Sequence, residues 1–249
     1  MKRKIPLIIF IAFFILSMSI APHVHGYSSE IRAHRTILWE LDVVPNDPFL
    51  MYYTEGGYWL AENETYIEFE VSSINDDIVG MLSLGNVSIS ANDTEIAKDL
   101  TLGVWGTYTE WWPGLIIEVS QTAITELNAT AFASAERVAG NFLNGTMSSN
   151  YETITIGSDE HQCITFDFEQ DPPGNQVTHL AYSLTTGVLI EANTSFTFAT
   201  PYELAFRFAG FQDPVDLTPD PGIVITIVGV VGGALIAIVI FVFVRSRKS

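Results

Sequence analysis

An uninterrupted apolar segment near the C-terminus constrains this chain more than any other feature. Residues Ile223–Val244 contain neither a charged residue nor a proline. At about 1.5 Å per residue, a helix of that length spans roughly 33 Å, which is enough for the hydrocarbon core of a bilayer. A basic tail, residues 245–249, follows directly, and basic flanks stay on the cytoplasmic side of a membrane. The sequence therefore predicts a transmembrane helix over residues 222–244 with its short tail inside the cell.

A second apolar segment, at the N-terminus, predicts secretion. Met1–Lys4 carries three basic residues, and Ile5–Ile20 contains no charge, which together form the pattern of a secretory signal peptide. Val24 and Gly26 occupy the small-residue positions that a signal peptidase reads, so we expect a signal peptide over residues 1–26. An uncleaved N-terminal anchor is the alternative. Either way, the chain between the two apolar segments is expected to face the outside of the cell.

This outer segment is strongly acidic. It holds five basic residues and all 29 acidic residues of the chain, which gives it a net charge of −24. Such a segment repels nucleic acid, so no nucleic-acid partner is expected. Net charge otherwise informs on solubility rather than on fold, and adaptation to a salty exterior stays open.

Six Asn-x-Ser/Thr sequons lie in the same outer segment. With 11 Asn in the chain, its share of Ser and Thr would produce about two sequons by chance. The excess predicts an N-glycosylated surface protein. The acceptor residues are Asn63, Asn86, Asn92, Asn128, Asn144 and Asn193.

The cysteine count excludes one source of stability. Cys163 is the only cysteine, so no intrachain disulfide can form. An outer segment of roughly 190 residues is long enough to bury a sufficient core without one. We therefore expect a single packed domain over residues 27–210.

Alternating apolar and polar residues predict that this domain is mostly β-sheet. The period of two is clear in residues 37–43, 67–71, 164–168 and 196–198, and it is typical of half-buried strands. Thr185-Thr186-Gly187 separates two further apolar stretches and predicts a hairpin turn. The sheet should therefore be mainly antiparallel.

Two segments instead indicate helices. Between Thr130 and Leu143 the apolar residues recur at three and four positions, and Asn144-Gly145 supplies a stop signal, which predicts an amphipathic helix. A shorter helix is expected from Thr94 to Leu100, with Asn92 or Asp93 as its N-cap. The last outer stretch, residues 211–221, contains three prolines and three aspartates, and predicts a stiff acidic stalk.

Several strings of this outer segment carry a family pattern. They are Gly85–Ser88, Asn92–Leu100, Trp111–Leu115 and Leu180–Leu189. Together they resemble archaeal surface proteins of the choice-of-anchor S class. The resemblance implies a signal peptide, a domain of this size and one C-terminal anchor, but no settled biochemical activity.

A looser resemblance concerns the hairpin around Thr185-Thr186-Gly187. The string Tyr182–Leu189 is similar to the Tyr-Asp-x-x-Thr-Gly-x-Leu hairpin of lipoprotein-carrier proteins, although Ser183 stands where Asp is usual. That resemblance implies an antiparallel half-barrel wrapped round helices. The expected fold class is therefore α+β, with a curved, half-barrel-like sheet packed on one or two helices and a C-terminal transmembrane helix.

Catalytic motifs are missing from the sequence. It contains no zinc-protease His-Glu-x-x-His, nucleophile elbow, phosphate loop or EF-hand loop, so we do not expect an enzyme. His161 and Cys163 would share one strand face, opposite Ile164, Phe166 and Phe168. A lone thiol beside a histidine is more often inert than catalytic.

Acidic clusters raise the question of calcium. They lie at Asn75–Asp77, Asn92–Glu95 and Asp213–Asp220. Calcium needs six to eight converging oxygens, and none of these clusters has the ligand spacing of a known loop. Turn formation, helix capping and solvation explain them, so neither a metal nor a cofactor is expected.

Aromatic residues between Gly103 and Gly114 are the most suggestive group. Trp105, Trp111 and Trp112 would suit sugars, lipid headgroups or a protein partner, or they would simply plug the open end of the sheet. In the transmembrane segment, Gly229 and Gly233 form a Gly-x-x-x-Gly pattern that permits a weak homodimer. Glycine is also frequent in membrane spans generally.

These patterns favour a non-enzymatic surface protein at the cell membrane. The first hypothesis is a binding module that takes a lipid-like or other hydrophobic ligand between helix and sheet. The alternative is a structural or adhesive coat protein without a small-molecule ligand, and an enzyme is third. The residues expected to line the ligand site are Trp105, Trp111, Trp112, Phe132, Phe142, Phe166, Phe168, Phe196 and Phe198.

The topology can be tested on intact cells. Protease added outside should remove the domain between Tyr27 and Pro221 and leave a membrane-held stub that begins near Ile223, because the basic flank at residues 245–249 keeps the tail inside. Mass spectrometry of the stub is the measurement. A protected domain with an accessible tail at residues 245–249 would reverse the assignment of sides.

Overall fold

The computed structural model describes residues 26–45, 49–53, 57–85, 87–96, 113–135, 145–172, 175–197 and 201–214. The chain up to Asp213 forms one compact unit, and residues 214–249 are grouped separately. Within the described ranges, no helix is long and apolar enough to cross a membrane. The expected transmembrane helix at 222–244 lies outside those ranges, as do residues 1–25 of the expected signal peptide and residues 215–221 of the expected stalk.

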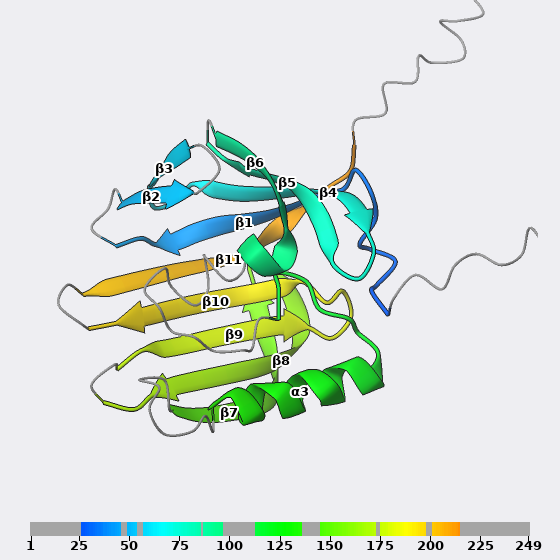
Figure 1. Ribbon diagram of the computed structural model, residues 1–249. Helices are drawn as coiled ribbons and strands as arrows, with labels where there is room; N and C mark the ends of the chain where they lie inside the picture. Colours follow the sequence, from blue (N-terminus) through cyan, green and yellow to red (C-terminus); the bar gives the residue numbers. More distant parts are fainter. Residues whose placement is uncertain are drawn as a thin grey trace, which may run out of the picture. The chain divides into compact units, whose positions relative to one another are not determined.

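The described part of the chain is mainly antiparallel β-sheet, as the alternation predicts (Figure 1). Nine strands form one sheet in the order β6-β5-β4-β1-β11-β10-β9-β8-β7, and two form a separate hairpin, β2-β3. The strands are β1 Thr36–Val43, β2 Phe49–Tyr53, β3 Gly57–Ala61, β4 Tyr66–Ile74, β5 Ile78–Leu84, β6 Val87–Asn92, β7 Gly145–Ile156, β8 Asp159–Gln170, β9 Val177–Ser183, β10 Leu189–Phe196 and β11 Tyr202–Gln212.

The nine-stranded sheet consists of two meanders joined at one seam. Strands β4, β5 and β6 follow one another on one side, and β11 back through β7 do so on the other. The seam is the antiparallel pairing of β1 with β11, in which Ile37 lies opposite Phe211 and Leu41 lies opposite Phe206. The first and the last strand of the domain therefore lie side by side in the middle of the sheet.

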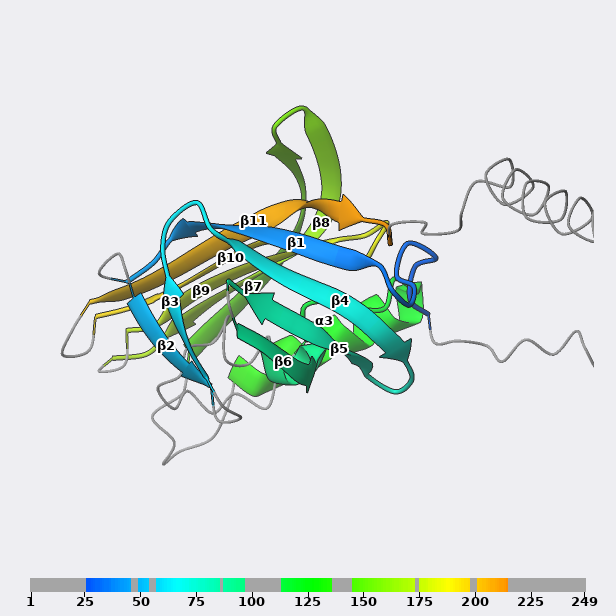
Figure 2. The ribbon, with the colours of Figure 1, turned by 90° about the horizontal axis from the view of Figure 1, so that it is seen from above.

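The sheet is curved, and its two faces differ. Figure 2 shows it bending around the side on which the helix α3 lies. We call this side the inner face. On β1 the buried residues Ile37, Trp39 and Leu41 alternate with more exposed neighbours, and all three belong to the main core. Trp39 also donates its indole Nε1–H to the carbonyl oxygen of Leu189, at 2.7 Å, so the core spans the seam.

A smaller cluster lies on the outer face. Cys163, Ala181 and Ile190 are buried together there, and Ile154, Ile156 and Phe208 pack against them. The tip of the β7–β8 hairpin projects on the side of the sheet away from α3 (Figure 2). This arrangement agrees with the expected alternation on β8, because Ile164, Phe166 and Phe168 belong to the main core instead.

The long helix begins earlier than the sequence predicts. The helix α3 runs Gln121–Ala135, so the expected start at Thr130 is wrong, and residues 136–143 lie outside the described ranges. The Ser120 hydroxyl accepts a hydrogen bond from the backbone N–H of Ala123, at 3.2 Å, and thereby caps the helix. Thr125 and Thr130 donate their hydroxyls to the carbonyls four residues before them, which accommodates two poor helix formers.

The face that α3 buries also differs from the expected one. Its buried residues are Ile124, Ala131, Ser134 and Ala135, whereas the Phe132 side chain is 38% exposed. Ile124, Ala131 and Ala135, spaced by seven and four residues, define the inward stripe, and Phe132 lies beside it on the more exposed side. The helix packs on the edge strand β7.

Two local predictions are confirmed. Of the short helix expected from Thr94 to Leu100, a helical turn is present at residues 93–96, and residues 97–100 lie outside the described ranges. The Asn92 side-chain oxygen accepts the N–H of Glu95 at 2.7 Å, as an N-cap does. The β9–β10 turn contains Gly187 at φ 78°, where a Cβ would lie 2.1 Å from the carbonyl oxygen of Ile117. Glycine is required at that position by both the backbone conformation and the lack of space.

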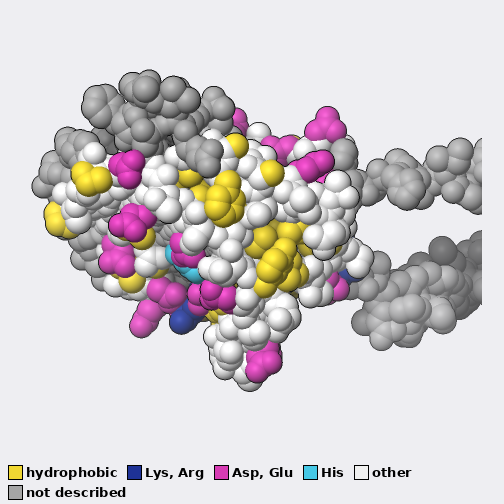
Figure 3. Space-filling view, turned by 90° about the horizontal axis from the view of Figure 1, so that it is seen from below, with side chains coloured by type: hydrophobic (Ala, Val, Ile, Leu, Met, Phe, Trp, Pro, Cys, Tyr) yellow, Lys and Arg dark blue, Asp and Glu magenta, His cyan; other side chains and the backbone are white. Residues whose placement is uncertain are grey.

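Acidic side chains cover much of the surface. Figure 3 shows them spread over the face seen from below, with very few basic side chains among them. Arg207 on β11 lies 3.3 Å from both Glu40 and Asp42 on β1, so one of the few cations bridges the seam on the outer face.

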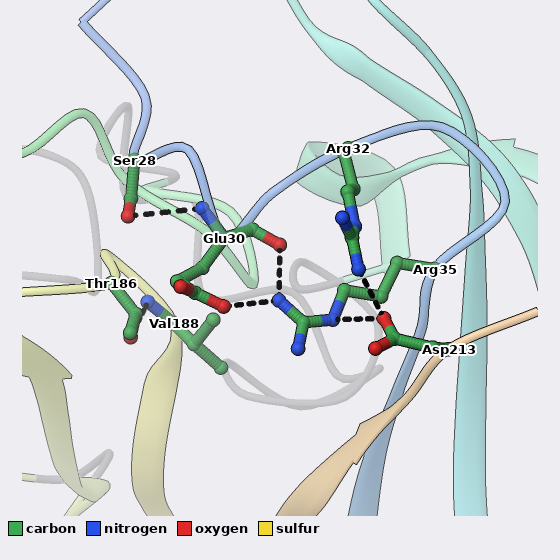
Figure 4. A network of polar contacts seen from close by, with 7 residues as sticks. All are labelled: Ser28, Glu30, Arg32, Arg35, Thr186, Val188 and Asp213. Atoms are coloured by element: carbon green, nitrogen blue, oxygen red, sulfur yellow. Dashed lines mark hydrogen bonds and ion pairs between the residues drawn. The ribbon is translucent and has the colours of Figure 1, made fainter.

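A second ionic network ties the two ends of the domain together (Figure 4). Arg35, just before β1, contacts Glu30 through its side chain and also donates to the Glu30 carbonyl at 3.0 Å. Its Nε atom lies 3.0 Å from Asp213, and its guanidinium stacks 4.2 Å from the Phe211 ring centroid. Arg32 contacts the same Asp213 oxygen at 2.6 Å. We call these four charged residues the terminal clamp.

The terminal clamp predicts unequal contributions from its two arginines. Arg35 is 14% exposed and combines ionic with cation–π contacts, so Arg35→Gln should lower the free energy of unfolding by about 1–2 kcal/mol. Arg32 is 57% exposed, and Arg32→Gln should have a smaller effect because solvent screens its charge. Urea unfolding at low and high salt measures both, and equal losses for the two variants would contradict the clamp.

Candidate ligand-binding face

The inner face carries a continuous apolar row across four strands. Phe166 on β8 lies opposite Leu180 on β9, which lies opposite Ala192 on β10, which lies opposite Phe206 on β11. All four side chains are at most 3% exposed. Since residues two apart on a strand share a face, this row continues along the same strands in both directions.

The next row contains polar side chains. Thr178 and Thr194 lie opposite each other, between Phe168 and Leu204, and each threonine is 1% exposed. Their hydroxyls are 2.8 Å apart, and the Gln176 side-chain amide donates to Thr178 at 2.9 Å and to Thr194 at 3.3 Å. These mutual hydrogen bonds offset the cost of burying polar groups in an apolar face. We call Gln176, Thr178 and Thr194 the polar row.

An aromatic pair lies beyond the polar row, at the end of β10 and the start of β11. Phe196 and Tyr202 stack with ring centroids 4.7 Å apart and planes 11° from parallel. Burial raises the pKa of the Tyr202 hydroxyl above its ordinary value, so the ring is neutral at physiological pH. The polar row thus lies between aromatic residues on both sides.

The structure brings together some of the residues expected to bind a ligand. Phe166, Phe168 and Phe196 share the inner face, the first two in the core and the third packed against it. Phe132 lies on α3 and is partly exposed. The remaining expected residues, Trp105, Trp111, Trp112, Phe142 and Phe198, lie outside the described ranges.

A segment that the sequence analysis missed closes the opposite end of the inner face. We call residues 113–119 the cross segment. Its Leu115 carbonyl accepts the N–H of Leu189 at 2.9 Å, and its Ile117 N–H donates to the Gly187 carbonyl at 2.8 Å. Leu115 and Ile117 are at most 5% exposed. The run Leu115-Ile116-Ile117 was the only signal in the sequence, and three apolar residues are too few to assign.

Polar groups gather where the cross segment meets the sheet. The Tyr182 hydroxyl donates to the Gly114 carbonyl at 2.7 Å, and burial raises the pKa of Tyr182. Asp93 is 1% exposed and accepts the N–H of Ile116 at 3.3 Å. The sequence indicated Asn92 or Asp93 as a helix cap, but it gave no sign that one would cap while the other was buried.

The expected inertness of the cysteine is consistent with its surroundings. Cys163 is buried in the outer cluster, and its thiol donates to the His161 carbonyl at 3.5 Å. Burial, with smaller contributions from Glu191 and Glu152, raises its pKa to about 12, so the thiolate is scarce at neutral pH. The His161 ring packs edge-on against Phe208, with centroids 5.9 Å apart.

Metal ligands do not converge in the described part of the chain. No group of three or more His, Cys, Asp and Glu side chains there is placed to hold an ion. At Asn75–Asp77 the Asn75 N–H donates to the Asp77 carbonyl at 3.0 Å, as a turn requires.

The sequons differ in exposure. Asn63 is exposed, whereas Asn92, Asn128 and Asn193 are partly buried, and Asn86 and Asn144 lie outside the described side chains. Asn92 and Asn193 already use their side chains, the first as the helix cap and the second in a bond to Glu203 at 3.1 Å. Asn63 is the most exposed of the four described acceptors, and its side-chain oxygen accepts the N–H of Val44 at 3.0 Å.

Comparisons with protein-family models, with curated proteins and with solved structures found no significant match.

The polar row makes a prediction about coupling. Thr178→Val and Thr194→Val should each destabilise the domain by about 1–2 kcal/mol, since each removes the bond between the two hydroxyls and one of the two acceptors of the Gln176 amide. The double variant should lose less than the sum, because the two hydroxyls bond each other. Urea unfolding of the four chains, with exposed Thr155→Val as control, gives the coupling. Strictly additive losses would show that the two threonines act separately.

Proposed function

We propose that this chain is an N-glycosylated surface protein, held in the cell membrane by its C-terminal apolar segment, whose outer domain binds a lipid-like ligand at the inner face. The observation that carries the proposal is the combination on one concave face of a continuous apolar row and a buried polar row. An amphiphile likewise combines an apolar chain with a polar group. Apolar faces of this kind, with few placed polar groups, are typical of small-molecule sites.

The elements over the inner face would enclose a ligand within the domain. The helix α3 packs on β7 at one edge, and the cross segment closes the ends of β9 and β10. The β2–β3 hairpin contributes Trp59 and Ala61 to the main core. The residues of the apolar row are at most 3% exposed, so an acyl chain would lie buried between the sheet and these elements.

The signals at the two ends of the sequence support the proposed location. A secretory signal, an apolar segment of membrane-spanning length and an excess of sequons agree with a glycosylated domain outside the cell. Gly229 and Gly233 would permit a weak homodimer within the membrane. The resemblance to surface proteins of the choice-of-anchor S class agrees with this location and adds no activity.

A structural coat protein is the second candidate, and one observation favours it. Trp39, Phe69 and Phe206 on the inner face are at most 1% exposed, as they would be in a core filled by the chain itself. In that case the acidic, glycosylated outer surface would be the functional part.

Lipid analysis of the full-length protein separates the two candidates. Ala192→Phe adds a ring in the middle of the apolar row, where Ala192 lies opposite Leu180 and Phe206. Val177→Phe places the same ring on an exposed position, 48% accessible, of the neighbouring strand β9. Both variants keep the same transmembrane segment, so lipid that adheres to it is equal in all samples.

We expect wild type and Val177→Phe to retain equal amounts of a lipid-like compound, and Ala192→Phe to retain several-fold less because the added ring occupies the seat. Organic extraction followed by mass spectrometry is the measurement, and thermal unfolding confirms that each variant is folded. Equal lipid content in all three folded proteins would favour the coat protein.

A further inference from the structure

Two carboxyl groups meet on a single backbone amide beside the cross segment. The N–H of Ile78, the first residue of β5, donates to an oxygen of Asp77 at 2.8 Å and to an oxygen of Asp93 at 3.2 Å. Burial and the neighbouring Asp77 carboxylate both disfavour the charged form of Asp93, so Asp93 is the member of the pair that retains a proton. The hydroxyl of Thr94 also donates to Asp77, at 3.3 Å.

The second oxygen of Asp93 reaches the cross segment. It accepts the N–H of Ile116 at 3.3 Å, and a Cβ on Gly114 would lie 2.4 Å from it. Asp93 is 1% exposed, so water does not share this contact. One buried carboxyl group thereby joins the start of β5 to the cross segment.

Among the described residues, the titratable groups that interact with this pair carry no positive charge to replace the proton. Tyr27 of the N-terminal segment interacts with both carboxyl groups and with Glu118, and Tyr182 on β9 interacts with Asp93. Burial, followed by Asp77, raises the pKa of Asp93, and the two backbone N–H donors only partly oppose this rise. Burial, then Asp93, Glu118 and Asp77, raises the pKa of the Tyr27 hydroxyl.

We propose that Asp77 and Asp93 form a proton-dependent latch that holds the cross segment against the sheet. While Asp93 holds the proton, it accepts the Ile116 N–H as a neutral carboxyl group, and the negative charge of the pair lies on the less buried Asp77. When the proton leaves, Asp93 becomes a buried charge, and opening of the cross segment lets water solvate that charge in place of the Ile116 N–H. The latch thus regulates access to the end of the inner face where Leu115 packs.

The sign of the pH dependence follows from proton binding. In the latched state Asp93 binds a proton that a solvated carboxyl group releases near pH 4. Between that pH and the raised pKa of Asp93, the latched state holds more protons, so its stability falls as pH rises. Most ion-paired carboxylates behave in the opposite way: their pKa is lowered, as it is for Asp213, so the stability that they contribute is lost as pH falls.

Hydrogen exchange of the full-length protein tests the latch without reference to any ligand. Protection of the peptide covering residues 113–119, corrected for intrinsic exchange rates, should fall at least about tenfold between about pH 6 and about pH 9, a range that reaches the pKa of a buried carboxyl pair. Protection of β10 in the same sample should stay constant.

Asp93→Asn removes the titration but has one acceptor oxygen in place of two, so either the Ile78 or the Ile116 N–H loses its acceptor. Protection of its cross segment should therefore be lower than in wild type and equal at both pH values. Asp77→Asn, which leaves Asp93 without a like charge, should reduce the pH response because burial alone then raises the Asp93 pKa, and it serves if Asp93→Asn fails to fold. Glu95→Gln, an exposed position two residues from Asp93, should behave as wild type. Constant protection in wild type, or an unchanged pH response in the Asn variants, would overturn the latch and leave the proposed ligand untouched.

Discussion

The pairing of β1 with β11 is the constraint on which the rest of this domain depends. It joins two meanders that are otherwise built from neighbouring strands of the chain. Without this seam, β4–β6 and β7–β10 would be separate small sheets, each too narrow to bury its own apolar face. With it, Trp39 on β1 reaches the carbonyl of Leu189 on β10, and both meanders contribute to one core.

Charge supports the seam from outside the core. The domain has very few cations, and three of them act where its two ends meet: Arg32 and Arg35 in the terminal clamp and Arg207 between β1 and β11. In a segment with this excess of acid, a cation near the seam reduces repulsion between the two meanders as well as forming its own pair. We expect Arg35 to contribute more than Arg32 to the stability of the domain. Arg35 contacts the Phe211 ring in addition to its ion pairs, so salt screens only part of its contribution.

Much of the sheet could be predicted from the sequence, because apolar residues at every second position indicate a strand with one buried face. The alternation on β1, β4 and β8 and the Gly187 turn were of this kind. The start of α3 was missed because Thr125 is a poor helix former, and only the fold shows that its hydroxyl bonds back to the carbonyl of Gln121. The predicted Asn92 cap was local and was confirmed.

The candidate site was less predictable, since it depends on contacts between residues far apart in the chain. The phenylalanines on β8 and β10 could be placed on one face by their spacing. The polar row could not, because Thr178 and Thr194 look like surface residues until their strands pair. The burial of Asp93 could not be predicted for the same reason, because its partner Ile78 lies 15 residues before it and its partner Ile116 lies 23 residues after it.

A disulfide across the seam tests the central claim most directly. Thr36 and Gln212 lie opposite each other in the β1–β11 register, and opposite residues in an antiparallel pair have the Cα spacing that a disulfide requires. The double variant Thr36→Cys/Gln212→Cys should oxidise fully and lose two reactive thiols on alkylation and mass spectrometry, with buried Cys163 unchanged. Leu38→Cys/Gln212→Cys, two residues out of register, should stay reduced. Oxidation of the shifted pair in place of the aligned one would contradict the seam, and with it the single inner face to which both meanders contribute.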